Sequence, residues 1–386
     1  MKEYFGKPIS KLGFGLMRLP FFGKSDSSPL DIDQITQMAD LFLQHGFSYF
    51  DTAYAYHGGQ SEVAFREAVS SRYPRDAFQI TTKLPLWRPL NHDEMREITN
   101  ESLTRLGVDF FDLYFLHSVG PDRFEMLEQI KAFDYLQSLK TEGITKNVGF
   151  SYHGDPESLG RLLDSFTPGF IDIVQLQINY FDWENPEVQS RRLYETVYER
   201  GIGIIIMEPV KGGLLADFDP DVAQILKQVD PQASLSSWAL RFVLELPGVV
   251  CVLSGMSNID HVIDNIKTAE SYTPLTDSNK DLLQAVISGL AALPTIDCTD
   301  CRYCVDDCPQ HINTPRIIQI LNDYTKYRNL PSSRRQYGFA TGGGFGGGGS
   351  PTGKSSDCEE CRTCEEHCPQ DLDIVGAHKQ AAELFE

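Results

Sequence analysis

Residues 110–117 read FFDLYFLH, an apolar and aromatic run that ends on a histidine. Two comparable runs come before it in the chain, FSYFDT at residues 47–52 and FQITTKL at residues 78–84. Short runs that are rich in aromatic, apolar and β-branched residues predict strands that are buried on both faces. Each of the three carries an ionisable residue at or next to its end. The sequence therefore predicts buried parallel strands that bring charged side chains to one edge of a sheet.

The same pattern recurs along the first two-thirds of the chain. Amphipathic stretches with a helical period separate most of the apolar runs, so neighbouring strands must pair in parallel through right-handed crossovers. Strands are predicted at residues 12–17, 47–52, 78–84, 110–117, 147–152, 171–178, 203–207 and 249–254. Eight such units in about 260 residues favour an α/β fold of the (β/α)8 TIM barrel type, because this is the usual size of that barrel. An open doubly wound sheet is the alternative, although no Gly-x-Gly-x-x-Gly follows the first strand.

The composition is that of an ordinary globular protein with an acidic surface. The 386 residues include 34 Lys and Arg against 54 Asp and Glu, which gives a formal charge of −20. A nucleic-acid or anionic-membrane partner is not expected, because phosphate binding needs clustered cations. The sequence has no apolar signal-peptide region near Met1 and no apolar run long enough to span a bilayer. We therefore expect a cytoplasmic location.

Four ionisable residues fall where a barrel would place catalytic groups, at and after the carboxyl ends of its second, third and fourth strands. They are Asp51, Tyr56, Lys83 and His117. Reduction of a carbonyl leaves negative charge on its oxygen, which needs a proton donor and a polarising hydrogen bond. Tyr56 would donate the proton, and Lys83 would favour its phenolate. Asp51 would hold Lys83 in place, and His117 would bind the substrate oxygen. Taken one by one, each residue is better explained by a structural role, and only the four together point to catalysis.

In this order the four residues resemble the motif of the aldo-keto reductase family. That motif is Asp-Thr-Ala-x-x-Tyr, followed by a strand-terminal Lys and a strand-terminal His, and it is matched here at residues 51–56, 83 and 117. The resemblance covers roughly the first 270 residues, and four matches in context are specific where one would be weak. It implies a barrel that reduces a small-molecule carbonyl substrate with NADPH or NADH.

The resemblance also implies which residues hold the nicotinamide cofactor across the barrel mouth. The implied positions are Ser151, Gln175, Met207, Lys211, Gly255 and Asn265. Ser151 and Gln175 match the positions that bind the carboxamide, and Asn265 matches an adenine contact. Lys211 could add a charge for the pyrophosphate, although a solvated loop lysine is an equally good interpretation.

Two of these positions depart from the family pattern. Met207 stands where a stacking Tyr is common. Gly255, like His261, stands at a position that is often basic in members that bind a 2′-phosphate. A 2′-phosphate prefers Arg or Lys, so the choice between NADPH and NADH stays open at this stage.

Eight of the nine cysteines form two copies of one pattern. The copies are Cys298-x2-Cys301-x2-Cys304-x3-Cys308-Pro309 and Cys358-x2-Cys361-x2-Cys364-x3-Cys368-Pro369. In two-cluster ferredoxins with this spacing, each [4Fe-4S] cluster takes three thiolates from one copy and the fourth from the other. Cluster one would use Cys298, Cys301, Cys304 and Cys368, and cluster two would use Cys358, Cys361, Cys364 and Cys308. Zinc is the alternative metal, but structural zinc sites usually take paired ligands. The ninth cysteine, Cys251, is expected to be a small buried hydrophobe in the eighth strand.

Together these patterns predict three segments. They are a barrel over residues 1–275, a connecting helix over 276–296, and a small α+β ferredoxin-like iron-sulfur domain over 297–386 with a mobile Gly-rich loop at 338–356. This arrangement is similar to aldo-keto reductases that carry a C-terminal ferredoxin-like domain.

The favoured function is NAD(P)H-dependent carbonyl reduction, with the clusters as structural, sensing or electron-transfer centres. The alternative is a ferredoxin-like electron-transfer protein, in which the clusters relay single electrons to or from the barrel or a partner. Because the chain is acidic, a redox partner would present a basic face.

Overall fold

The computed structural model describes residues 4–6, 9–22, 28–88, 90–306, 308–342 and 352–386. The chain forms two compact units, which are described separately below. The first unit comprises Met1–Val210 and Ser236–Leu275, and the second comprises Lys211–Leu235 and Thr276–Glu386. The second unit therefore includes a segment that follows the seventh strand of the first.

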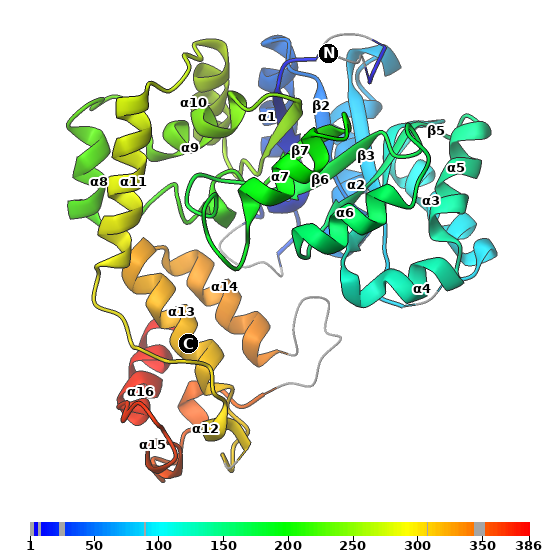
Figure 1. Ribbon diagram of the computed structural model, residues 1–386. Helices are drawn as coiled ribbons and strands as arrows, with labels where there is room; N and C mark the ends of the chain where they lie inside the picture. The colour runs from blue at the N-terminus through cyan, green and yellow to red at the C-terminus, as the bar shows by residue number, and fades with distance from the viewer. Residues whose placement is uncertain (1–3, 7–8, 23–27, 89, 307, 343–351) are drawn as a thin grey trace. The chain divides into compact units, whose positions relative to one another are not determined.

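The first unit is built around a closed barrel of parallel strands in chain order, β1 to β8 (Figure 1). The strands are β1 (Leu12–Gly15), β2 (Tyr49–Asp51), β3 (Gln79–Leu84), β4 (Phe111–Val119), β5 (Thr145–Tyr152), β6 (Ile173–Gln177), β7 (Gly203–Met207) and β8 (Val249–Ser254). The barrel closes where Gly13 of β1 pairs with Leu253 of β8. The predicted barrel is confirmed, and the open doubly wound sheet is excluded.

Helices cover the outside of this barrel (Figure 1). They are α1 (Ile32–Gln44), α2 (Gln60–Phe65), α3 (His92–Leu106), α4 (Phe124–Gln129), α5 (Ala132–Thr141), α6 (Pro156–Asp164), α7 (Ser190–Tyr198), α9 (Leu235–Leu244) and α10 (Ile259–Glu270). Several begin at a capping side chain, as α3 does at Asn91, which forms a capping box with Glu94. The amphipathic pattern of residues 122–140 predicts one helix, but Lys131 adopts a left-handed φ of 52° and divides it into α4 and α5.

The barrel interior is packed with side chains. Phe5, Tyr49, Phe115 and Cys251 belong to the buried cluster inside it, and Cys251 is completely buried, as the sequence predicts. Gly13 is required here, because a Cβ atom at this position would lie 2.6 Å from Sγ of Cys251. A filled interior means that chemistry in this unit is confined to the barrel rim.

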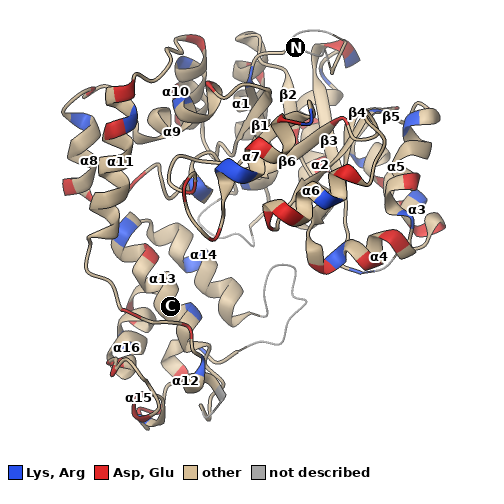
Figure 2. Ribbon diagram, viewed as in Figure 1, with Lys and Arg blue, Asp and Glu red and all other residues tan. Residues whose placement is uncertain are grey.

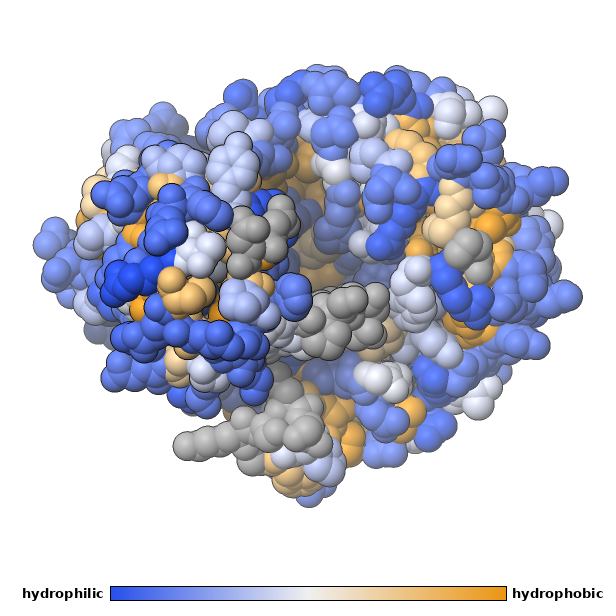
Figure 3. Space-filling view, turned by 90° about the horizontal axis from the view of Figure 1, so that it is seen from below, coloured by the Kyte–Doolittle hydropathy of each residue, from blue (hydrophilic) through white to orange (hydrophobic). Residues whose placement is uncertain are grey.

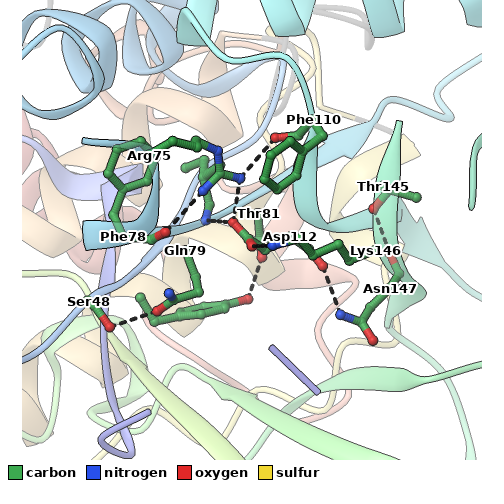
Figure 4. A network of polar contacts seen from close by, with 12 residues as sticks. Ser48, Arg75, Phe78, Gln79, Thr81, Phe110, Asp112, Thr145, Lys146 and Asn147 are labelled. Carbon is green, nitrogen blue, oxygen red and sulfur yellow. Dashed lines mark hydrogen bonds and ion pairs between the residues drawn. The ribbon is translucent and has the colours of Figure 1, made fainter. Parts of the chain in front are cut away.

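A polar network lies at the amino ends of β3, β4 and β5 (Figure 4). Its centre is the buried carboxylate of Asp112, which accepts hydrogen bonds from Arg75 Nη2 at 2.7 Å, Lys146 Nζ at 3.1 Å and the amide of Ile80 at 3.0 Å. Arg75 also donates to the carbonyl of Phe78 at 3.0 Å. These bonds tie three strands together at the end of the barrel opposite the rim that carries Asp51 and Lys83.

The second unit is helical in its described residues. Its helices are α8 (Pro220–Lys227), α11 (Asp277–Ala291), α12 (Tyr303–Asp306), α13 (Thr314–Tyr327), α14 (Leu330–Thr341), α15 (Thr363–Glu366) and α16 (Ile374–Phe385). Extended backbone pairing is limited, in this described part, to an isolated bridge between Ile312 and Gly353. Apolar residues of α13, α14 and α16 form the core, among them Ile320, Tyr337 and Phe385.

The predicted Gly-rich loop at 338–356 needs a correction at its start. Residues 338–341 form the last turn of α14, where the hydroxyl of Thr341 donates to the carbonyl of Tyr337 at 3.0 Å. Most of the glycine tract, residues 343–351, lies outside the described residues. The helix extends past the polar stretch because Tyr337 and Thr341 are buried in the core of the unit.

Charged residues of both signs are interspersed over the helices (Figure 2). One face of the molecule is covered mainly by hydrophilic residues, with hydrophobic ones in small separate areas (Figure 3). Within the described part of the chain, no helix combines the length and the apolar character needed to cross a bilayer.

The Asp112 network yields a stability prediction. Replacing Asp112 by Ala leaves a buried amide and two cations without their acceptor, which should lower the free energy of unfolding by about 2–3 kcal/mol. Urea unfolding followed by tryptophan fluorescence would measure the change. The matched control is Asp109→Ala in the exposed turn before β4, which should stay within about 0.5 kcal/mol of the parent. Equal stability of the two variants would contradict this role of Asp112.

Candidate functional site

The barrel brings three of the four predicted catalytic residues to adjacent strands. Asp51 ends β2, Lys83 lies near the end of β3, and His117 lies near the end of β4. Lys83 is in register with Phe115 of β4, two residues before His117. Tyr56 follows β2, at the start of the short 3-10 helix η2 (Tyr56–Gly59). Parallel strands end on the same rim, so these side chains converge.

A buried ion pair lies at the centre of this site. Lys83 Nζ donates to Asp51 Oδ1 at 2.5 Å and to the carbonyl of Thr52 at 2.7 Å. Only 1% of the Lys83 side chain and 4% of the Asp51 side chain are exposed. Burial alone would lower the pKa of Lys83, but the charge of Asp51 and the hydrogen-bonded Tyr56 outweigh it and raise that pKa. Lys83 is therefore an ammonium at neutral pH.

Tyr56 contacts both Lys83 and His117. The Lys83 Nζ atom lies 5.1 Å from the centre of the Tyr56 ring, and the rings of Tyr56 and His117 are 5.7 Å apart in an edge-on arrangement. Burial, together with the nearby charge of Lys83, lowers the pKa of His117 to about 3. The imidazole is therefore neutral at physiological pH and carries one N–H donor.

The expected effect of Lys83 on Tyr56 is only partly borne out. Lys83 does favour the phenolate, but desolvation is larger and the pKa of Tyr56 is raised above its ordinary value. The sequence cannot give this result, because the depth of burial is set by the packed rim. In the resting site Tyr56 is a neutral phenol with its proton in place.

Two of the predicted carboxamide contacts lie on neighbouring strands. Ser151 of β5 and Gln175 of β6 are paired in register, and both are buried. The Ser151 hydroxyl accepts from the amide of Ser118 at 2.8 Å. Gln175 Nε2 donates to Asp51 Oδ2 at 3.2 Å. Gln175 thus links the predicted cofactor positions to the ion pair.

The other predicted cofactor residues are more scattered. Asn265 in α10 donates to the Ser254 hydroxyl at 2.6 Å, and Met207 ends β7. Lys211 belongs to the second unit. There, burial raises the pKa of Asp323 in α13. The positive charge of Lys211 opposes this rise more strongly than the other nearby cations do. The structure therefore places the ammonium of Lys211 within electrostatic reach of an acidic side chain.

A cation beside Gly255 was missed by the sequence analysis. A Cβ atom on Gly255 would lie 3.1 Å from Cδ of Arg18, which follows β1 in the 3-10 helix η1 (Leu16–Arg18). Arg18 and Gly255 are far apart in sequence but meet because β1 and β8 close the barrel. No local signal in the sequence identifies this pair.

Glu62 and Arg105 hold the loop that carries Tyr56, and the sequence analysis missed them too. Arg105 donates from Nη1 to the carbonyl of Tyr54 at 3.3 Å and lies over the Tyr54 ring at 4.4 Å. Its partner Glu62 is buried and accepts from the hydroxyl of Thr82 at 2.7 Å, one residue before Lys83.

In the second unit the cysteines line two cavities. The first is lined by Cys298, Cys301, Cys304 and Cys368, together with apolar residues that include Ile318 and Ile374. The second is lined by Cys308, Cys358, Cys361 and Cys364, together with Val375 and His378. Each cavity thus combines three cysteines of one tract with the last cysteine of the other, and the donor set is one that suits an iron-sulfur cluster.

The two tracts are structural repeats, offset by 60 residues (358 minus 298). Three non-glycine residues of each tract adopt left-handed φ values at equivalent positions, which are Asp300, Arg302 and His311 in the first and Glu360, Arg362 and Asp371 in the second. Such residues cost about 1–2 kcal/mol each in backbone energy. The same left-handed positions in both tracts indicate that the two loops share one backbone conformation.

A cubane cluster and a single ion place different demands on such loops. Within the described ranges, no group of three or more His, Cys, Asp or Glu is arranged to hold one metal ion. This is compatible with a cluster, because four iron atoms separate the sulfur ligands more widely than a single ion does.

Two curated relatives are similar to the barrel. An L-galactose dehydrogenase from Arabidopsis thaliana is 26% identical over 281 residues, which is 68% of this chain and 84% of the relative. An NADH-specific methylglyoxal reductase from Escherichia coli is 24% identical and is covered over 96% of its length by 73% of this chain.

Solved structures share the fold. An aldo-keto reductase from Bacillus halodurans in its holo form matches with a TM-score of 0.58 and 25% identity, over 72% of this chain and 92% of its own. An aldo-keto reductase from Klebsiella pneumoniae in complex with NADPH matches with a TM-score of 0.58 and 20% identity, over 72% of this chain and 91% of its own.

The sequence patterns of two families also match. The 4Fe-4S dicluster domain matches residues 297–372, which assigns iron-sulfur clusters rather than zinc to the cysteine tracts. The pattern of the aldo/keto reductase family matches residues 11–287, which is most of the chain. This chain, with its closed barrel and the residues at its rim, is therefore an oxidoreductase of the aldo/keto reductase family that carries a 4Fe-4S dicluster domain.

Proposed function

We propose that the barrel reduces the carbonyl group of a small molecule with a nicotinamide cofactor, and that Tyr56 is the proton donor. One observation carries this proposal. The buried ion pair of Lys83 with Asp51 lies against Tyr56, and the ring of the neutral His117 packs edge-on against the same phenol ring. A proton donor, a fixed positive charge and a neutral hydrogen-bond donor are what a carbonyl oxygen needs as it gains charge.

Each side chain has a separate task. A bound nicotinamide would supply the hydride to the carbonyl carbon. The N–H group of His117 donates a hydrogen bond to the carbonyl oxygen and orients it. Tyr56 transfers its O–H proton to that oxygen as the hydride arrives, and Lys83 stabilises the phenolate that remains. Asp51 and the carbonyl of Thr52 fix Lys83, so the ammonium needs no reorganisation during the reaction.

The cofactor site is proposed along the rim. Ser151 and Gln175 would bind the carboxamide, and Asn265 would contact the adenine. Support for NADPH comes from Arg18, which supplies a cation beside Gly255 where the sequence lacks one. A relative is named for its NADH specificity and a neighbouring structure contains NADPH, so both forms are kept as candidates.

We also propose that each cysteine cavity holds one [4Fe-4S] cluster. The first would be bound by Cys298, Cys301, Cys304 and Cys368, and the second by Cys358, Cys361, Cys364 and Cys308. Support comes from the lining of the two cavities, which combines the tracts in this crossed manner. Thiolate ligands of this kind persist in a reducing compartment, so we propose the cytoplasm as the location.

Electron relay by the clusters is the less favoured function. If the clusters exchange electrons with another protein, we propose a partner with a basic surface. Support comes from exposed acidic residues of the second tract, such as Glu359, Glu360 and Glu366, and from the overall charge of −20.

Removal of the Tyr56 hydroxyl tests the carbonyl reductase proposal. Tyr56→Phe should lower kcat by about 10²–10⁴-fold, because it loses a general acid but keeps the ring. The assay follows NADPH or NADH oxidation with methylglyoxal and with simple aldehydes as probe substrates, and binding of each cofactor should stay at the wild-type level.

Tyr54→Phe is the matched control for that variant. The Tyr54 hydroxyl donates to Glu101 at the exposed side of the loop, at 2.8 Å, so its loss should leave kcat within a few fold. Full carbonyl reductase activity in Tyr56→Phe would sink the assignment of the proton donor.

The pKa shifts predict a flat pH profile for carbonyl reduction. The pKa of His117 is lowered to about 3, and those of Lys83 and Tyr56 are raised above their ordinary values. All three groups thus keep their protonation state between pH 5 and 8, and kcat/KM should be constant over this range. An acid limb near pH 6.5 that disappears in His117→Asn would show instead that the imidazole titrates.

Cysteine substitution tests the crossed ligand sets. Cys368→Ala should reduce the iron content from about eight to about four atoms per chain, because one cluster loses a ligand. Chemical iron analysis and the visible absorption of anaerobically purified protein would measure this. Cys251→Ala, inside the barrel, is the control and should keep all the iron. A Cys368→Ala protein with unchanged iron would contradict the proposed set.

A further inference from the structure

The two halves of the dicluster repeat differ in polarity at one pair of buried positions. With the offset of 60 residues, Thr314 at the start of α13 is equivalent to Ile374 at the start of α16, and Ile318 is equivalent to His378. The apolar pair, Ile318 and Ile374, lines the first cavity. The polar pair, Thr314 and His378, lines the second, and Thr314 lines the first as well. The pair therefore breaks the symmetry of the repeat.

The polar pair is fully buried and forms a hydrogen-bonded line. Only 1% of Thr314 and 2% of His378 are exposed. The Thr314 hydroxyl lies 3.1 Å from Nε2 of His378, and the Ser355 hydroxyl lies 3.2 Å from Nδ1. The amide of Ser355 donates to the Tyr337 hydroxyl at 2.6 Å, which fixes the outer end of the line. A buried threonine and histidine in place of two isoleucines are tolerated because they satisfy one another.

The line ends beside a predicted cluster ligand. Thr314 and Cys304 line the same first cavity, and the Thr314 hydroxyl works against the rise in the pKa of Cys304 that burial causes. Burial lowers the pKa of His378 to about 4, so the imidazole is neutral and has one donor and one acceptor. With the Thr314 proton directed at the Cys304 sulfur, Nε2–H of His378 donates to Thr314 and the Ser355 hydroxyl donates to Nδ1.

We propose that Thr314 and His378 make the two clusters electrochemically different, by holding a hydrogen bond on the Cys304 sulfur that raises the reduction potential of the cluster bound there. Thr314 lies beside the ligand in the first cavity, and His378 is a positioning residue that keeps the Thr314 proton aimed at the sulfur. This inference rests on the clusters that the proposed function places in the two cavities.

The physical reason is the charge that reduction adds. A one-electron reduction makes the cluster and its thiolates more negative, and a hydrogen bond to a ligand sulfur stabilises that added charge more than it stabilises the oxidised state. In a buried site with a low dielectric constant, such a bond has a large effect, because solvent does not replace it. The equivalent position in the other half of the repeat, Ile374, has no proton to donate.

The test makes the repeat symmetric. Thr314→Ile and His378→Ile convert the polar pair to the apolar pair of the other half, and Thr314→Ser retains the hydroxyl. Thr341→Val is the matched control, because its buried hydroxyl donates to the carbonyl of Tyr337 within α14. Reduction of the anaerobic holoprotein would be titrated with dithionite, and both midpoint potentials would be read by EPR, with iron content measured on each sample.

We expect two separate midpoints in the wild type, the higher of which moves to more negative values in Thr314→Ile and in His378→Ile. Thr314→Ser and Thr341→Val should keep the wild-type values. Unchanged midpoints in the isoleucine variants at full iron content would overturn the inference. If Thr314→Ile does not retain its iron, His378→Ile decides by the same criterion. A wild-type protein that binds no iron would contradict the proposed cluster sites themselves. The carbonyl reductase assay tests the proposed function of the barrel separately.

Discussion

The ion pair between Lys83 and Asp51 is the constraint around which the rim of the barrel is organised. Removing two charges from water is costly unless their remaining hydrogen-bonding groups find partners. Here the Thr52 carbonyl accepts a second hydrogen bond from the ammonium, and Gln175 from β6 donates one to the carboxylate. The pair therefore depends on side chains from β2, β3 and β6, and the closed barrel brings the ends of these strands to one rim. Its charge then acts on Tyr56 and His117 together, since both side chains lie beside it.

The Asp112 network serves the opposite end of the same strands. It contacts no catalytic residue, but it ties β3, β4 and β5 together at their amino ends (Figure 4). Lys83 and His117 lie on two of these strands. The loop that carries Tyr56 is held separately, by Arg105 of α3, which donates to the carbonyl of Tyr54 and to the carboxylate of Glu62 in α2. Stability and chemistry are thus divided between the two ends of the barrel, as the fold favours.

The two units carry different kinds of redox chemistry. A nicotinamide releases two electrons as a hydride, whereas a cubane takes one, and no flavin-binding motif is evident in the sequence to convert between them. The segment Lys211–Leu235 follows β7 but belongs to the dicluster unit, where Asn329 donates to the carbonyl of Gly213 at 3.3 Å. The segment after β7 is therefore part of the second unit, although the chain returns to the barrel after it.

Much of this organisation follows from the sequence alone. Buried parallel strands appear as continuous apolar runs, and the catalytic tetrad could be located because ionisable residues end those runs. The cysteine spacing likewise indicates a dicluster module, since three ligands on a tight loop have a local signature. Only the tertiary structure decided what burial and closure control. It raised the pKa of Tyr56, brought Arg18 to Gly255, divided residues 122–140 at Lys131 and joined Thr314 to His378. These outcomes depend on contacts between distant segments and on the water excluded from them, and a local pattern of residues encodes neither.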